Sequence, residues 1–204
     1  MNRSAAWRNG TPLSYSNSVR RPLTTYIAFL RAVNVAGHPI VKMADLRVTF
    51  AAAGCKNVRT YIQSGNVVFE CAEDKAVAMF ERVRIKVQLL LGMEPQILFR
   101  KLRDLERIIK AAPFDGLKSE SPVKLYVAFL ADLPRVKPKL PLVSEKEAVE
   151  AIAIKDREAF IVTRQKPSGF FGFPNNFIEK ELGVAATSRN WSTVTKIVDF
   201  ARCS

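Results

Sequence analysis

The sequence predicts an α+β fold in which a ferredoxin-like split β-α-β-β-α-β half is followed by a second, smaller α+β half. Two observations predict this class. Over residues 24–101, runs rich in β-branched and aromatic residues alternate with helical periodicity in the order strand, helix, strand, strand, helix, strand. That order is typical of an antiparallel sheet with both helices on one face. Past residue 101, strands and helices recur in a different order.

Clear signals bound the elements of the first half. The run TTYIAFLRAV is of strand type, and in the next segment Met43, Leu46 and Phe50 recur at helical spacing before Gly54, a residue type that often ends helices. The runs VRTYIQ and NVVFECA form a predicted hairpin around Ser-Gly, a turn that accepts positive φ. The helical run DKAVAMFERVRIKVQLLLG ends at Gly92, and EPQILFRK supplies the fourth strand.

Alternation along the strands predicts which side chains face the two helices. Those on the helix side are predicted to be Val58, Thr60, Ile62, Val67 and Phe69 from the hairpin, with Ile27 and Phe29 from the first strand. Arg59, Tyr61 and Gln63 are predicted to lie on the opposite face, which is open unless the second half covers it.

The second half is predicted to span residues 102–204 and to pack on the first. LRDLERIIKAAP is helical up to its proline, VKLYVAFLAD is a strand, EAVEAIAIKD and REAFIVTRQ form a hairpin, and NNFIEKELG and WSTVTKIVDFA are closing helices. The segment PRVKPKLP is a predicted loop or hinge. Residues 1–23 are rich in Ser, Asn and Arg without hydrophobic periodicity, so a disordered basic tail is predicted there.

The formal net charge of +13 is the strongest compositional signal. The first 23 residues hold four arginines and no acidic residue, so the remainder of the chain is basic in its own right. Such a charge attracts phosphates, nucleic acid or acidic partners. A generally basic proteome would give the same surplus.

Cysteine and histidine usage narrows the chemistry. Cys55, Cys71 and Cys203 are odd in number and far apart, which favours a reduced, cytoplasmic protein over a disulfide framework. His38 is the single histidine, so zinc motifs with two histidines are excluded, and any catalytic triad would depend on this residue. No metal or cofactor is predicted. No run of about eighteen apolar residues exists, so no membrane partner is expected.

A first polar group lies at the end of the first strand and in the hairpin: Arg31, Asn34, Gly37, Gln63, Ser64 and Asn66. Turn chemistry accounts for Asn, Ser and Gly at such places, because their side chains serve neighbouring backbone groups. The alternative is a small site for an anion. In the split topology the end of the first strand and the hairpin turn need not share an edge, so convergence is left open.

A second polar group precedes and opens the last helix: Thr187, Ser188, Arg189, Asn190, Trp191, Thr193 and Lys196. Thr187 and Asn190 are candidate N-caps, and a helix N-terminus beside an arginine suits a phosphate. Arg189 is therefore predicted to face a cleft between the halves and to clamp an anion together with Arg31 and Asn34. The alternative is that Arg189 binds backbone carbonyls across the interface. Trp191 is interpreted as a core anchor.

Three motifs carry a family resemblance. YIAFLRAVNVAG followed by MADLR, the hairpin TYIQSGNVVF, and GVAATSRNWSTVTKI occur in this order. They resemble the bacterial family catalogued as domain of unknown function 1697, over about residues 24–200. Ala32 and Ala36 replace glycines of that family's loop, which makes a very close backbone approach of a ligand less secure there. The resemblance implies a two-part α+β fold and no particular activity.

Three functions follow as hypotheses. The leading one is binding of an anionic ligand, either nucleic acid or a phosphate-containing molecule; Tyr26 and Tyr61 are candidates for stacking bases on the open face, although the hairpin lacks the aromatic motif of RNA-recognition domains. The second is a small phosphate-processing hydrolase resembling acylphosphatase, with Arg31 and Asn34 at the phosphate. The third is a non-catalytic interaction scaffold whose second half covers the open face.

Overall fold

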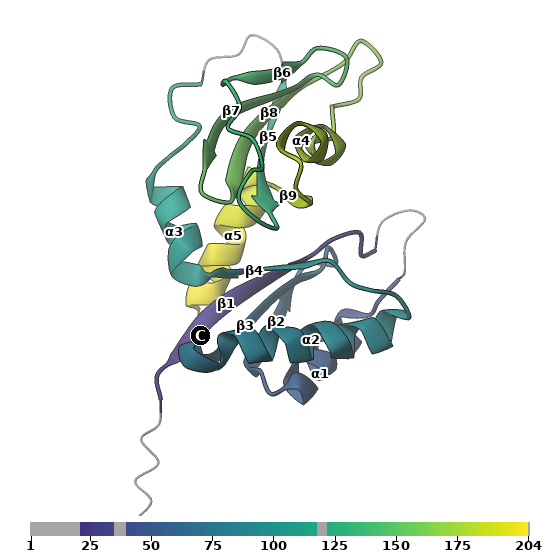
Figure 1. Cartoon of the computed structure of the whole chain (residues 1–204), viewed down its shortest axis with the longest axis vertical. Coiled ribbons are helices and arrows are strands. Elements are labelled where there is room, and N and C mark those ends of the chain that lie inside the picture. The colour runs from purple at the N-terminus through teal and green to yellow at the C-terminus, as the bar shows by residue number, and fades with distance from the viewer. Residues whose placement is uncertain (1–20, 35–39, 118–121, 204) are drawn as a thin grey trace, which may run out of the picture.

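The computed structural model describes residues 21–34, 40–117 and 122–203. Two antiparallel sheets lie one above the other, with one helix pair outside the first sheet and another helix pair beside the contact between the halves (Figure 1). The predicted α+β class is confirmed. The predicted tail over residues 1–23 falls almost wholly outside the described residues, as does Gly37 of the first polar group.

The first sheet has the strand order β2-β3-β1-β4, with every pair antiparallel. This is the order expected of a split β-α-β-β-α-β unit. Its elements are β1 (Leu23–Leu30), α1 (Met43–Ala53), β2 (Lys56–Tyr61), β3 (Asn66–Ala72), a short 3-10 turn (Glu73–Lys75), α2 (Ala76–Leu91) and β4 (Ile97–Lys101).

Both helices of the first half end where the sequence predicted. Gly54 follows α1 with φ of 104° and Gly92 follows α2 with φ of 70°, a backbone region that glycine enters without a steric cost. Leu46 and Phe50 of α1 and Val83 of α2 are buried against the sheet. Helical spacing of apolar residues therefore places the first core between the helix pair and one face of the sheet.

The second sheet has the order β6-β7-β8-β5-β9. The elements of this half are α3 (Leu102–Lys110), β5 (Val123–Leu130), β6 (Leu142–Ser144), β7 (Val149–Lys155), β8 (Glu158–Arg164), α4 (Pro174–Leu182), β9 (Ala186–Asn190) and α5 (Trp191–Arg202). The predicted strand, hairpin and helices are present. The short strands β6 and β9 were not predicted from the sequence.

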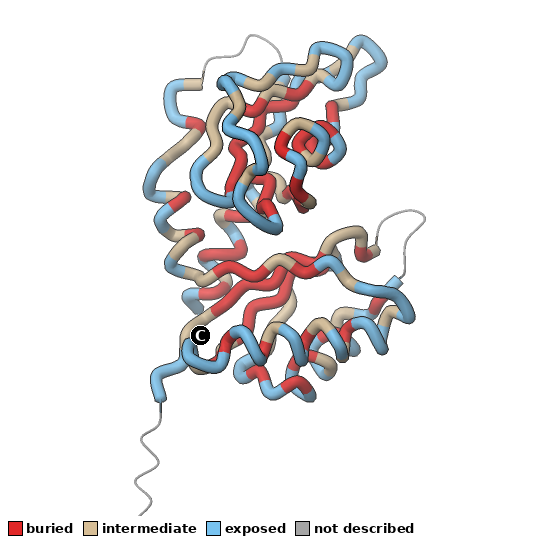
Figure 2. Tube along the Cα trace, viewed as in Figure 1, coloured by how far each residue is buried: buried red, intermediate tan, exposed pale blue. Residues whose placement is uncertain are grey.

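A shared core joins the halves. The ring of Phe29 on β1 stacks on that of Phe129 on β5 with centroids 4.1 Å apart. Buried side chains of α3 and α5, such as Leu105 and Ile197, pack into the same cluster. Figure 2 shows the buried residues running along the strands of both sheets, with exposed residues on the outer turns of α1 and α2. The second half thus covers the sheet face that the first half leaves without helices.

The predicted side-chain directions hold for most of the hairpin and are wrong for β1. Val58, Val67 and Phe69 pack on the helix side as predicted. Ile27 and Phe29, predicted to face the helices, instead enter the core shared with the second half. Because β1 is buried on both faces, its residues are apolar at nearly every position, and alternation carries no information on direction. Ile62, also predicted to face the helices, is exposed in the turn.

Within the described residues, no helix has the length and apolar content needed to cross a membrane.

Candidate functional site

The turn between β2 and β3 is locked against the end of β1. The Leu30 amide donates to the Gly65 carbonyl at 2.8 Å. Gly65 has φ of 69°, and a Cβ atom there would lie 2.9 Å from the Leu30 Cβ. A larger residue is therefore excluded both by backbone conformation and by space. The hairpin and the end of the first strand, whose convergence the sequence left open, meet at this turn.

Asn66 has a specific partner in the second half. Its side chain is completely buried, and its Oδ1 accepts a hydrogen bond of 2.6 Å from Nε of Arg189. Its Nδ2 donates to Ser64 Oγ at 2.8 Å and to the Tyr61 carbonyl at 3.3 Å. The Ser and Asn of the hairpin thus form a small polar network that receives Arg189.

Arg189, near the end of β9, uses all five of its N–H groups on neutral acceptors. Besides Nε to Asn66, Nη1 donates to Thr187 Oγ1 at 2.9 Å and to the Ser188 carbonyl at 3.0 Å. Nη2 donates to the carbonyls of Leu30 at 2.8 Å and Ser64 at 3.0 Å. Among the described residues no carboxylate forms an ion pair with it. Burial lowers the pKa of Arg189 to about 10, which leaves it a cation at neutral pH.

Arg31 has a counter-ion, in contrast to Arg189. Its guanidinium forms a bidentate ion pair with Glu179 of α4, in which Nη2 lies 3.0 Å from Oε2. Nη1 also donates to Gln96 Oε1 at 2.9 Å. Glu179 in turn accepts a hydrogen bond of 2.7 Å from the Ala186 amide. The charge of Arg31 is therefore compensated within the chain.

Asn34 serves the backbone. Its Nδ2 donates to the carbonyls of Val41 at 3.0 Å and Gln63 at 2.9 Å, and its Oδ1 accepts from the Val41 amide at 2.7 Å. The Gln63 side chain is exposed. Arg31 and Asn34, the two residues on which the acylphosphatase hypothesis rested, are thus both engaged by other groups of the protein.

Of the two predicted caps, Asn190 alone caps α5. Its Oδ1 accepts from the Ser192 amide at 3.2 Å. Thr187 lies within β9 instead, because β9 runs almost to the first residue of the helix, and its hydroxyl accepts from Arg189. Trp191 packs edge-on against Phe114 with ring centroids 5.2 Å apart, as expected of a core anchor.

A cavity of about 450 Å³ lies between the halves next to Arg189. The starts of two helices border it: Phe173, Asn175 and Asn176 come from the first turn of α4, and Asn190 and Thr193 from that of α5. The backbone amides at a helix start carry partial positive charge. The other lining residues are Leu30, Arg31, Ala32, Val33, Ser64, Thr187, Ser188 and Arg189.

Two buried oxygens of this lining have no hydrogen-bond partner in the described part of the chain. They are Asn175 Oδ1 and Ser188 Oγ, in residues that are each 8% exposed. An unpaired buried polar group costs about 1–3 kcal/mol. Both atoms have almost no solvent-accessible surface, so they lie behind the cavity wall. Phe173 borders the same cavity with 61% of its surface exposed.

The α4 contribution was missed from the sequence. Phe173, Asn175, Asn176 and Glu179 lie in a segment interpreted only as a closing helix. Pro174 at the first helical position was the available signal for a helix start, since proline favours that place. The start of α4 lies near the start of the last helix because of the order of strands in the second sheet, and no local sequence pattern reveals that order.

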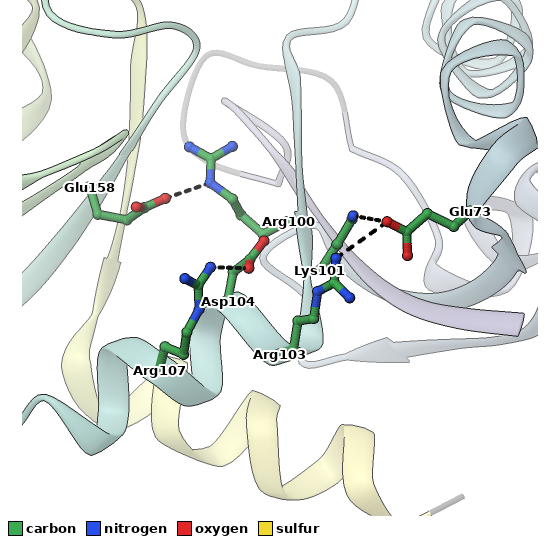
Figure 3. Close-up of polar contacts among 7 residues, drawn as sticks. All are labelled: Glu73, Arg100, Lys101, Arg103, Asp104, Arg107 and Glu158. Atoms are coloured by element: carbon green, nitrogen blue, oxygen red, sulfur yellow. Dashed lines mark hydrogen bonds and ion pairs between the residues drawn. The ribbon is translucent and has the colours of Figure 1, made fainter.

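A second polar contact joins the halves at the junction of β4 and α3. Nε of Arg100 lies 2.6 Å from Oε1 of Glu158 on β8, and Figure 3 shows Arg100 reaching away from Lys101 and Arg103, which turn to Glu73. Arg107 pairs with Asp104 one helical turn away. Burial lowers the pKa of Arg100, and the adjacent carboxylate opposes that shift.

The stacking face required by the RNA hypothesis is absent. Tyr26 points to the helix side, where burial raises its pKa to about 12. Tyr61 packs on Phe200 of α5 with ring centroids 5.4 Å apart. Arg59 donates to carbonyls at the end of α5, at 3.0 Å for Phe200. The aromatic residues proposed as a platform are therefore parts of the two cores.

Among the described residues, no group of three or more His, Cys, Asp or Glu side chains is arranged to hold a metal ion.

Comparison with known proteins identifies the family and the fold. No curated protein matches the chain. The conserved bacterial protein SP0830 from Streptococcus pneumoniae has a similar structure, with a TM-score of 0.56 and 18% identity over 88% of this chain and 99% of that chain. That likeness shows the fold alone. The model of the family described as "Protein of unknown function (DUF1697)" matches residues 23–160, more than half of the chain and including the first two of the three motifs, and the protein therefore belongs to this family, as the resemblance predicted.

Proposed function

We propose that this protein binds a small anionic molecule, with a phosphate group as the leading candidate, in the cavity between its halves. The observation that carries the proposal is the combination, around one cavity, of two helix starts and a guanidinium without a carboxylate partner in the described residues. Each helix start favours negative charge, and Arg189 adds a full positive charge.

Arg189 acts through its charge in this proposal. All five of its N–H groups are already donated to neutral acceptors, so its contribution is the field of a cation surrounded by low-dielectric protein. Direct hydrogen bonds would come from Thr193 and backbone amides of the helix starts. The anion clamp predicted from Arg31, Asn34 and Arg189 is thus modified: Arg31 lines the cavity with its charge compensated by Glu179, and Asn34 holds the loop after β1 to the hairpin.

Nucleic acid is the other anionic candidate that the sequence suggested. What supports it is the surplus positive charge, which would act through phosphate contacts on the surface. The hydrolase hypothesis has less support, because its two residues are engaged elsewhere. The scaffold hypothesis is supported by the second half, which covers the face of the first sheet that has no helices. The expected cytoplasmic location fits Cys55, Cys71 and Cys203, which are all free.

Isothermal titration of the full chain with inorganic phosphate, at fixed ionic strength set with sodium chloride, tests the proposal. We expect saturable binding to one site. Replacement of Thr193 by alanine should weaken it about ten-fold, because a hydrogen bond to a charged group is worth about 1.5–3 kcal/mol. The control is Thr195→Ala, a threonine of the same helix outside the cavity lining.

Saturable binding that Thr195→Ala leaves unchanged and Thr193→Ala weakens would support the cavity as the site. Binding that falls steeply with salt and is equal in both variants would place the anion on the basic surface instead. Failure of phosphate and of phosphate esters to bind at all would overturn the proposal.

A further inference from the structure

We infer that the exposed basic residues around α3 form a docking surface for the phosphate backbone of duplex nucleic acid. We call this surface the α3 basic surface. It consists of three residues of α3, two at the turn between β7 and β8, and one at the end of α5: Arg103, Arg107, Lys110, Lys155, Arg157 and Arg202. None of them lines the cavity beside Arg189, so the inference does not rest on the proposed function.

The three residues of α3 form a stripe. Arg103, Arg107 and Lys110 are four and three residues apart, a spacing that places side chains on one face of a helix, and all three are exposed. Leu105 and Ile108 point the other way and are buried in the core shared by the halves. With a rise of about 1.5 Å per residue, the charges follow one another at about 5–6 Å along the helix. Such a stripe can meet several phosphates of one backbone.

Two hollows adjoin the stripe and extend it to neighbouring elements. A hollow of about 210 Å³ is bordered by Arg107 together with Lys155 and Arg157 from the turn between β7 and β8. An open groove of about 770 Å³ is bordered by the whole stripe and by Arg202 of α5. Arg107 belongs to both walls, so the six basic residues form one continuous surface.

Positive charge dominates the exposed part of this surface. Among the described residues that line the two hollows, the exposed charged ones are six basic residues and one acidic residue, Asp156. The other carboxylates lie deeper. The Arg107 side chain is 75% exposed and its partner Asp104 32%, and the Arg202 side chain is 56% exposed and its partner Glu106 35%. A ligand that approaches from solvent therefore meets guanidinium and ammonium groups first.

The existing ion pairs leave these cations available to phosphate. The pair of Arg107 with Asp104 joins residues one helical turn apart at the surface (Figure 3), where an ion pair contributes little and a phosphate can replace the carboxylate. Lys110, Lys155 and Arg157 form no ion pair within the described ranges of the chain. Their charges are met only by solvent.

The absence of aromatic residues favours a duplex. Of the described residues that line the two hollows, none is aromatic, and the apolar ones are Ile108 and Ile109. Proteins that hold single strands usually stack bases on aromatic rings. A surface of lysine and arginine alone recognises the backbone of a duplex and does not distinguish its sequence.

Fluorescence anisotropy of a labelled DNA duplex of about two helical turns, titrated with the full chain between about 50 and 200 mM salt, tests the inference. We expect the double variant Arg107→Gln, Lys110→Gln to reduce the slope of log Kd against log salt by about two, because each basic residue that meets a phosphate contributes about one. The loss should be the same for duplexes of different sequence. An RNA duplex of the same length separates the two sources of this chemistry, since the tighter binder of the two is the ligand.

The matched control is the double variant Lys137→Gln, Lys139→Gln. It removes the same charge from an exposed loop outside both hollows and should leave the slope unchanged. Both double variants should unfold at the temperature of the wild type, because all four residues are exposed. Titration with inorganic phosphate should give the same result for Arg107→Gln, Lys110→Gln as for the wild type. The cavity proposal and this inference can therefore fail separately.

Equal loss of slope in the two double variants would mean that the overall charge of the protein binds the duplex, and would overturn the α3 basic surface. A single strand of the same length that binds as tightly as the duplex would overturn the duplex as ligand. Tighter binding of poly-glutamate than of the duplex would assign the surface to an acidic protein instead. No binding of any duplex at about 50 mM salt would end the inference.

Discussion

Arg100 and Arg189 both cross between the halves, and they differ in how their charge is compensated. Arg100 on β4 pairs with Glu158 and also donates to the carbonyls of Leu130 at 2.7 Å and Arg157 at 3.1 Å. Arg189 on β9 crosses the same interface in the opposite direction, to Asn66 and to carbonyls of β1 and the hairpin, without a carboxylate partner in the described residues. We call these contacts the Arg100 joint and the Arg189 joint.

The comparison shows that an interface arginine can have its charge compensated by a carboxylate, or can have all its hydrogen bonds made while its charge stays uncompensated. At the Arg100 joint a carboxylate neutralises the guanidinium. At the Arg189 joint the hydrogen bonds are complete but the charge is not compensated, and a cavity bordered by two helix starts lies beside it. A half-buried cation that has no carboxylate partner in the described residues is costly, and in the proposed function an anion from solution compensates its charge.

The largest expected effect is at the Arg100 joint. Replacing Glu158 by alanine should lower the free energy of unfolding by about 3–5 kcal/mol, because it leaves a buried guanidinium unpaired. Urea denaturation followed by circular dichroism measures it. Replacing Glu106 by alanine is the control, since its ion pair with Arg202 is largely exposed and should be worth less than about 1 kcal/mol.

The double variant Arg100→Met, Glu158→Leu sharpens this result. It removes both charges and should recover part of the lost stability, because apolar residues of similar volume often replace a buried ion pair without loss, while the Leu130 and Arg157 carbonyls still lose the donor that Arg100 supplied. A single Glu158→Ala variant as stable as Glu106→Ala would show that the Arg100 joint does not depend on its carboxylate.

The next effect is at the Arg189 joint. Replacing Arg189 by methionine should cost about 3 kcal/mol, because the Leu30 and Ser64 carbonyls and Asn66 Oδ1 lose their donor at about 1 kcal/mol each, the lower end for a buried acceptor, since Arg189 is only half-buried and water can reach part of the space it leaves. No unpaired charge remains, so the loss is smaller than at Glu158. The measurement is again urea denaturation, here with and without phosphate.

The change in stability on adding phosphate separates a ligand-binding role of the Arg189 charge from a purely structural one. Wild type should gain stability with phosphate, while Arg189→Met should gain little, since the cation near the cavity is gone. A similar gain in both proteins would mean that Arg189 only joins the halves, which was the alternative interpretation of this residue from the sequence.

How far the sequence predicted these joints depends on the type of signal. Gly54 and Gly92 ended the helices because glycine at left-handed φ is a local requirement. The hairpin motif predicted Ser64 and Asn66 as polar site residues. Each accepts a hydrogen bond from Arg189, Ser64 with its backbone carbonyl and Asn66 with its Oδ1. The carboxylate partners across the interface could not be predicted. Glu158 meets Arg100 and Glu179 meets Arg31 only because the second half packs on the first.

Strand β9 shows a second limit. Its sequence ATSRN has the residue types of a helix cap, and only pairing with β5 makes it extended. Strand β6 has three residues, too few for alternation to be seen. In β1 the apolar run is buried on both faces, so the sequence identified the strand but not which side chains meet the second half.

The smallest expected effect concerns the loop that borders the Arg189 cavity. Ala32 has φ of 53°, a region that is unfavourable for residues with a Cβ atom. Replacing Ala32 by glycine should therefore stabilise the protein by about 0.5–1 kcal/mol, because the relief of the left-handed strain exceeds the added entropy of the unfolded chain. Replacing Ala51, an exposed helical residue of α1, by glycine is the control and should destabilise by about 0.5–1 kcal/mol. Thermal unfolding of the wild type, Ala32→Gly and Ala51→Gly measures whether each replacement raises or lowers the stability. A loss of stability in both variants would show that Ala32 contributes contacts that outweigh its backbone strain, and that the cavity wall at β1 is built around its methyl group.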